Sequence, residues 1–182
     1  EEHGDAVEAG ADPDELSRRA ERVEVRLPEP GDAARQDVAL PEGRGQGEPL
    51  SSRLRPPDGA EFCGAMIGDS EQKYLLASDA GYGFVAKLGD LYAKNKAGKA
   101  VLKVPKGAKV LPPQRVASYD EEWVASITSE GRLLTFMIGE LPRMAKGKGV
   151  KIINIPSAKL SKREEYVVAT IVFGEEIGRA HV

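Results

Sequence analysis

Three basic, glycine-rich turns contain the residues of this sequence that are best suited to chemistry. They run from Arg44 to Gly47, from Lys94 to Lys99 and from Arg143 to Lys151. Glycines let the backbone approach a partner closely and leave N–H groups exposed, and lysines add mobile positive charges, so each turn suits phosphate oxygens. One such turn alone is more often a solvated connection between strands. Three of them at the same phase of a repeat favour a basic rim along which a curved duplex could run.

The cations that we expect to contact phosphates are those of the three turns. They are Arg44, Lys94, Lys96, Lys99, Arg143, Lys146, Lys148 and Lys151. Lysines on glycine-rich turns meet the sugar–phosphate backbone rather than base edges, so we expect binding that is insensitive to DNA sequence.

Catalytic constellations are missing from the rest of the sequence. The two histidines, His3 and His181, lie at the chain ends, and Cys63 is the single cysteine, so a histidine-activated nucleophile within the core is excluded. The Gly81–Lys87 stretch superficially matches nucleotide-binding glycine loops, but a strand rather than a helix is expected after the glycines. The acids at 120–122 are typical of a solvated turn rather than a metal site. We expect neither a catalytic residue nor a metal or cofactor in this stretch.

The formal net charge of −3 conceals two regions of opposite sign. Residues 1–43 carry 13 Asp and Glu against 5 Lys and Arg, whereas residues 44–173 carry 14 against 20 and contain all ten aromatic residues. The composition of the first region therefore indicates a linker or non-native segment, disordered or partly helical, although Val23, Val25 and Leu27 also alternate as in a strand. The longest apolar run, Val167–Phe173, is too short for a membrane helix, and a cytoplasmic location is expected.

From Arg44 onward, short runs of β-branched and aromatic residues alternate with turn residues, which is typical of an all-β protein. Glycine at the ends of 79–81 and 129–131 supplies the positive φ of a hairpin turn. The predicted strands are Lys73–Ser78, Gly83–Leu88, Lys99–Val104, Trp123–Thr128, Arg132–Ile138, Val150–Ile155 and Tyr166–Phe173.

The two hairpins repeat each other along the chain. Gly81, Gly89 and Leu91 match Gly131, Gly139 and Leu141 at a constant offset of 50 residues, and Pro105 matches Pro156 at an offset of 51. A period of this length with about four strands per unit is typical of a bladed or pinwheel array. We therefore predict a propeller-like β-pinwheel of two complete blades and part of a third.

Four motifs together resemble a known family. They are Arg44–Leu50, Ala77–Phe84, Lys96–Ala100 and Lys146–Ser157, in the order and spacing found in the C-terminal domain of the A subunit of bacterial DNA topoisomerase IV, a relative of gyrase A. The resemblance covers about residues 40–173. It implies a non-catalytic β-pinwheel that binds bent double-stranded DNA on its outer edge and supports ATP-dependent relaxation and decatenation by the whole type IIA topoisomerase, in the nucleoid.

The resemblance also locates what this chain does not contain. The catalytic tyrosine lies in another part of the same polypeptide, which forms a homodimer, and ATP and Mg belong to other domains and to the partner B subunit. The Gln-Arg-Arg-Gly-Gly-Lys-Gly box of gyrase A is missing, which favours topoisomerase IV over gyrase. Residues 174–182 are expected to be an artefactual tail. The alternative from another class is a propeller-like protein-interaction scaffold, which would show dispersed cations and an apolar patch.

Overall fold

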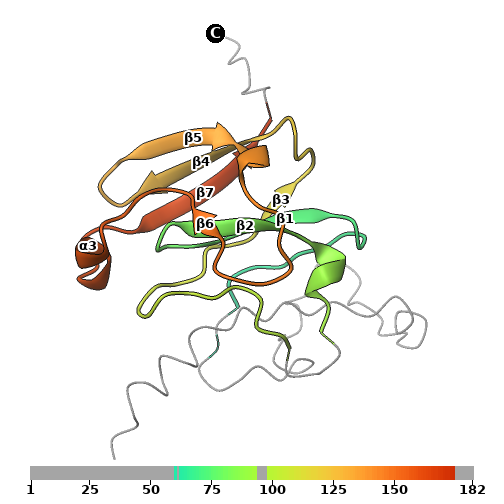
Figure 1. Cartoon of the computed structure of the whole chain (residues 1–182), viewed down its shortest axis with the longest axis horizontal. Coiled ribbons are helices and arrows are strands. Elements are labelled where there is room, and N and C mark those ends of the chain that lie inside the picture. Colours follow the sequence, from blue (N-terminus) through green and yellow to red (C-terminus); the bar gives the residue numbers. More distant parts are fainter. Residues whose placement is uncertain (1–59, 61, 94–97, 175–182) are drawn as a thin grey trace, which may run out of the picture.

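The computed structural model describes residues 60, 62–93 and 98–174 and contains two antiparallel sheets (Figure 1). The first sheet has the strand order β3-β1-β2-β6. Its central hairpin joins β1 (Lys73–Ser78) to β2 (Tyr82–Lys87). The outer strands are β3 (Gln114–Val116) and β6 (Val150–Lys151). We call this sheet blade 1.

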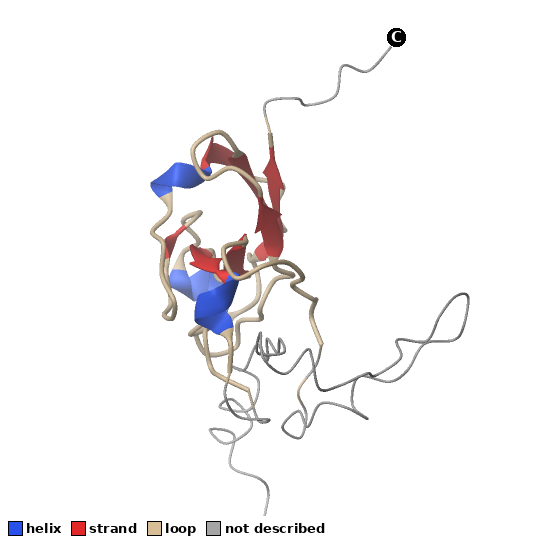
Figure 2. Ribbon diagram, turned by 90° about the vertical axis from the view of Figure 1, so that its right-hand side faces the viewer, coloured by secondary structure: helices blue, strands red, loops and turns tan. Residues whose placement is uncertain are grey.

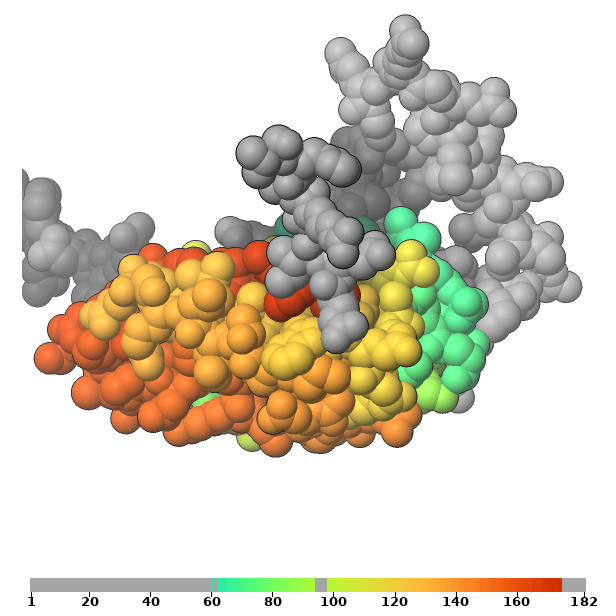
Figure 3. All heavy atoms as spheres, turned by 90° about the horizontal axis from the view of Figure 1, so that it is seen from above, coloured from blue at the N-terminus to red at the C-terminus, as the bar shows by residue number. Residues whose placement is uncertain are grey.

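The second sheet, blade 2, has the order β5-β4-β7. Its strands are β4 (Trp123–Thr128), β5 (Leu133–Met137) and β7 (Val167–Phe173). The short helices are η1 (Leu88–Leu91), η2 (Ile138–Glu140) and α3 (Ser157–Ser161), and the strands dominate the ribbon in Figure 2. The β4–β5 hairpin lies on the surface, where Figure 3 shows it in yellow to orange.

The repeat of 50 residues is confirmed in atomic detail. Gly81 and Gly131 have φ angles of 78° and 77°. Each donates its N–H to the residue three positions earlier, at 3.0 Å to Ser78 and 2.9 Å to Thr128. After each hairpin the chain makes a short 3-10 turn, η1 or η2. The two hairpin turns are therefore equivalent, as the constant offset predicted.

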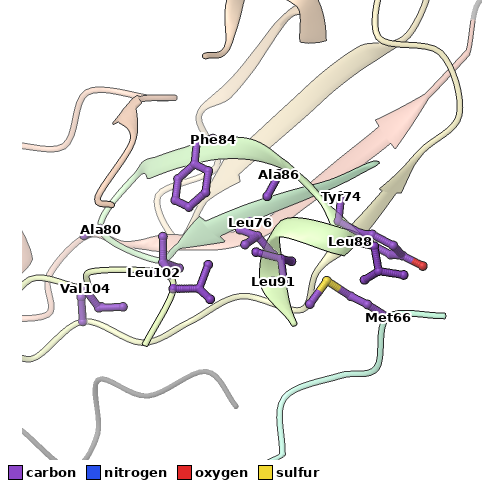
Figure 4. Packing of buried hydrophobic residues seen from close by; sticks show 12 residues of the cluster. Met66, Tyr74, Leu76, Ala80, Phe84, Ala86, Leu88, Leu91, Leu102 and Val104 are labelled. Atoms are coloured by element: carbon purple, nitrogen blue, oxygen red, sulfur yellow. The ribbon is translucent and has the colours of Figure 1, made fainter. Parts of the chain in front are cut away.

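Alternation along the central strands of blade 1 fills two cores. Tyr74, Leu76 and Phe84 point to one side, where they pack with Val101 and Leu102 of the following segment (Figure 4). The neighbouring residues on the same strands, Leu75, Ala77 and Val85, point to the other side and pack against Val124, Ile138 and Ile152. Since a strand presents successive side chains to opposite faces, both faces of blade 1 are covered and blade 2 is docked on one of them.

Strands are exchanged between the repeats. β6 follows the hairpin of blade 2 but pairs with β2 of blade 1, at Tyr82 opposite Lys151 and Gly83 opposite Val150. The strands expected to begin a third blade thus join the two existing sheets, because β6 completes blade 1 and β7 pairs with β4. Among the described residues, blade 2 has three strands and blade 1 has four. The all-β pinwheel is confirmed, and its third unit contributes strands rather than a separate sheet.

Some local expectations differ from the structure. Residues 99–104 form no strand but a single bridge from Leu102 to Gly147, and regular pairing in 150–155 stops at Lys151. The backbone bonding of Asp79 to Lys109 is repeated by Ser129 with Tyr166, an offset of 57. Since the prolines at 105 and 156 are offset by 51, six extra residues are inserted after Pro156, and they hold α3. The expectations for residues 1–43 and for most of the C-terminal tail lie outside the described residues.

Among the residues that the structure describes, no helix has the length and apolar character needed to cross a bilayer.

Candidate nucleic-acid interface

The basic segment Pro142–Lys151 lies along the open edge of β2. Val85 donates its N–H to Pro142 O at 3.0 Å, and Met144 donates back to Val85 O at 2.8 Å. Further along, Ile152 donates to Gly81 O at 2.7 Å. Because hydrogen bonds to β2 flank this glycine- and lysine-rich segment, its backbone is fixed although its side chains face solvent.

A second basic segment, residues 98–110, runs beside the first. Lys103 donates its N–H to Gly147 O at 2.8 Å, and Gly147 donates to Val101 O at 2.9 Å. Val101, Leu102 and Val104 are buried in the core of blade 1, which leaves Lys103 exposed. The two segments therefore form one continuous surface, in which Lys103 of one backbone neighbours Lys146 and Lys148 of the other. We call it the basic surface.

The structure describes five of the eight predicted cations, and four of them lie on Pro142–Lys151. The Lys148 Nζ atom lies 3.7 Å from the centre of the Tyr82 ring, and the Arg143 guanidinium lies 4.7 Å from that of Tyr119. Such cation–π contacts hold a charge in place without neutralising it. These cations remain exposed.

The other predicted cations differ in their freedom. Lys146 is exposed, and Lys151 is exposed but donates to Asn154 Oδ1 at 2.9 Å. Lys99 is half-buried and its Nζ donates to the backbone oxygen of Asp90 at 2.6 Å, so it is the least available of the five. Arg44, Lys94 and Lys96 lie outside the described residues.

Sequence reasoning missed Lys103 and Lys109, which are exposed cations of the second basic segment. They stand outside the glycine-rich turns on which the prediction was built. A different signal marks them, because the stretch between Asp90 and Asp120 contains seven Lys and Arg and no acid, and so does the stretch between Glu140 and Glu164. A stretch without acids keeps its cations free of local ion pairs, which is the pattern of an electrostatic footprint.

A separate charged cluster surrounds Glu165. This buried carboxylate accepts a hydrogen bond from Arg132 Nε at 2.6 Å and lies 3.6 Å from Lys159 Nζ. Burial alone would raise the pKa of Glu165, but hydrogen bonds from Arg132 and Thr128 and the charges of Arg132 and Lys159 outweigh it and lower that pKa. Arg132 and Lys159 are therefore engaged in structural pairs, and we do not count them in the basic surface.

Glu165 makes stability depend on pH in the acid range. A folded-state pKa below the unfolded value means that the contribution of Glu165 is complete above the unfolded pKa and is lost as the pH falls through the folded one. We expect Glu165→Gln to lower the urea midpoint at neutral pH, and we expect the difference from wild type to shrink progressively below about pH 4. Glu164→Gln, at an exposed neighbour, is the matched control. A difference that is constant with pH would contradict this assignment.

Docked blades that exchange strands and carry an exposed cationic edge define a class, the propeller-like DNA-binding modules. The family model described as "DNA gyrase C-terminal domain, beta-propeller" matches residues 72–116 and 122–173. The chain belongs to this family, and the resemblance inferred from its motifs is confirmed.

Individual relatives narrow the family to one branch. The chain is 53% identical over 129 residues to the A subunit of DNA topoisomerase 4 from Pseudomonas aeruginosa and 47% identical over 128 residues to its counterpart from Escherichia coli K12. These matches cover 71% and 70% of the chain, which spans 17% of each relative's length. The solved structure of the E. coli ParC C-terminal domain is 44% identical with a TM-score of 0.67, covering 72% of this chain and 53% of that one.

Proposed function

We propose that this chain is a duplex-DNA-binding module from the A subunit of a topoisomerase IV and that it binds the phosphate backbone on the basic surface. The observation that carries the proposal is the pairing of Lys103 with Gly147, which brings two acid-free segments into one surface. Exposed cations from both segments then lie at neighbouring positions on a fixed backbone. This arrangement suits a partner that presents closely spaced negative charges along a line.

The chemistry of the surface favours backbone contacts over base reading. Its cations are mostly lysines, which act as mobile point charges rather than as the planar forks that recognise guanine edges. The α-helix described in this chain, α3, has five residues and is too short to serve as a recognition helix. The proposed partner is therefore double-stranded DNA of any sequence.

The role in the whole enzyme is the wider part of the proposal. There the module would engage a bent duplex and support ATP-dependent relaxation and decatenation. Cleavage would be carried out by a dimer of A subunits through regions outside this chain, and ATP would be used by the B subunit. The names of the relatives support this role, together with a place at the bacterial nucleoid.

The test is a titration of the full chain with a short mixed-sequence duplex at several salt concentrations. With Lys103, Arg143, Lys146 and Lys148 each on one phosphate, the slope of log K against log salt should be about −3 to −4. A second duplex of the same length and unrelated sequence should bind equally well. Weak binding with a slope near zero, or a strong preference for one sequence, would refute the proposal.

A further inference from the structure

The basic segment crosses β2 at a point where both backbones are glycine. Gly149 has a φ of 79°, and a Cβ atom built on it would lie less than 3.0 Å from the carbonyl oxygen of Gly83. A Cβ on Gly83 would come equally close to Ile152 Cδ1 and Leu76 O. Backbone atoms cannot move aside as a flexible side chain can, so neither position has room for a side chain.

This crossing fixes where the lysines of the segment lie. Immediately before it, Lys148 reaches the Tyr82 ring, and Gly147 pairs with the backbone of Lys103. Immediately after it, Val150 stands opposite Gly83 and Lys151 stands opposite Tyr82. A displacement of the segment at Gly149 would therefore move Lys146 and Lys148 away from Lys103 while leaving every charge in the molecule.

We propose that Gly83 and Gly149 are positioning residues for DNA binding. Their crossing seats the basic segment that follows the blade 2 hairpin on the edge of blade 1, so that cations from two repeats form one phosphate-binding surface. The proposal rests on the proposed function. It adds that the surface of a blade is completed by the repeat that follows it, and that binding depends on this junction as well as on the number of charges.

The experiment compares two glycines that have the same backbone conformation and different surroundings. Gly149→Ala introduces a collision with Gly83, whereas Gly131→Ala, at a φ of 77°, has nothing within 4 Å of the new methyl group. Both variants carry the cost of an L-residue at positive φ, so their difference isolates the crossing. The full chain of each variant is titrated with the short mixed-sequence duplex against salt, after circular dichroism has confirmed its sheets.

We expect Gly149→Ala to flatten the salt slope by about 2 units, because Lys146 and Lys148 lose their places, and to weaken binding roughly 60-fold at 0.1 M salt. Gly131→Ala should keep the wild-type slope. Hydrogen exchange gives a local readout, since the amides of Met144 and Ile152 bond to β2 and should lose protection in Gly149→Ala only.

A gentler variant covers the case in which Gly149→Ala does not fold. Val150→Pro, at an exposed position of β6, removes one N–H from the strand without placing an atom in the crossing, and we expect the same loss of slope. If wild type binds and a folded Gly149→Ala or Val150→Pro keeps the wild-type slope, the positioning role is refuted and the proposed function stands. If wild type does not bind the duplex, both proposals fail.

Discussion

Replacing Lys146, Lys148 and Lys151 together by alanine is expected to flatten the salt slope of duplex binding by about 2–3 units. Each lysine that contacts a phosphate releases about one counterion on binding, and all three side chains are exposed on a fixed segment. The lower end of the range applies if Lys151 stays with Asn154, whose Oδ1 atom it already contacts at 2.9 Å. At 0.1 M salt, such a change corresponds to a loss of affinity of roughly 100-fold or more.

Two matched variants separate charge from shape in this experiment. Arginine at the same three positions keeps the charge and should keep the slope, because counterion release depends on charge. Alanine at Lys159 and Lys162, which pair with glutamates at 2.8 and 3.9 Å, removes two positive charges from the α3 region and should leave the slope unchanged. If the triple alanine variant has intact sheets and binds as wild type does, the basic segment is only a solvated connection.

The parts of the fold that the sequence predicts well are those with a local signal. The bounds of β1 and β4 agree with the predicted strands, because each run of β-branched and aromatic residues is followed by a turn that ends in glycine. The offset of 50 residues is equally local, since it compares each hairpin with itself. Both hairpins, their turns and the pinwheel class were therefore accessible from the residue pattern.

The parts that were not predicted depend on distant partners. β3 follows two prolines and consists of Gln114, Arg115 and Val116, so it has no strong strand pattern of its own and exists because β1 offers an edge. The predicted strand 150–155 shortens to two paired residues because β2 meets it only at Tyr82 and Gly83. Pairing choices of this kind are settled by the three-dimensional arrangement of the blades rather than by propensity.

The candidate site was accessible only in part for a related reason. Glycine-rich composition identifies Arg143 to Lys151, but it cannot show that Lys103 lies beside that turn, since the contact joins residues 44 positions apart. Nor does composition separate free cations from paired ones. Lys99 and Lys148 stand in similar glycine–lysine contexts, yet one is bonded to the backbone of Asp90 and the other lies exposed over a tyrosine ring.

The second large effect is expected at Asp79, the acid at the turn of blade 1. Its buried carboxylate accepts the N–H of Lys109 at 2.7 Å and pairs with Arg163 at 2.6 Å, while its backbone oxygen accepts the N–H of Val167. Asp79 thus links the hairpin of blade 1 to the strand that enters blade 2. Ser129, the equivalent residue of blade 2, accepts the N–H of Tyr166 in the same way but carries no charge.

We expect Asp79→Ala to lower the free energy of unfolding by about 2–3 kcal/mol, because the Lys109 N–H loses its acceptor and Arg163 loses its partner. The value lies below that of a fully buried pair, since Arg163 is 36% exposed and can be hydrated. Asp79→Asn keeps an oxygen for Lys109 and should lose about half as much.

Urea unfolding of the single variants and of Asp79→Ala combined with Arg163→Ala measures the coupling between the two side chains, which we expect to be about 1–2 kcal/mol. Lys162→Ala, whose partner Glu164 is exposed, is the control and should cost less than about 1 kcal/mol. Additive effects of the two substitutions would show that the pair does not act as a link between the blades. Stability would then depend on the apolar packing of Val124, Ile138 and Ile152 against blade 1.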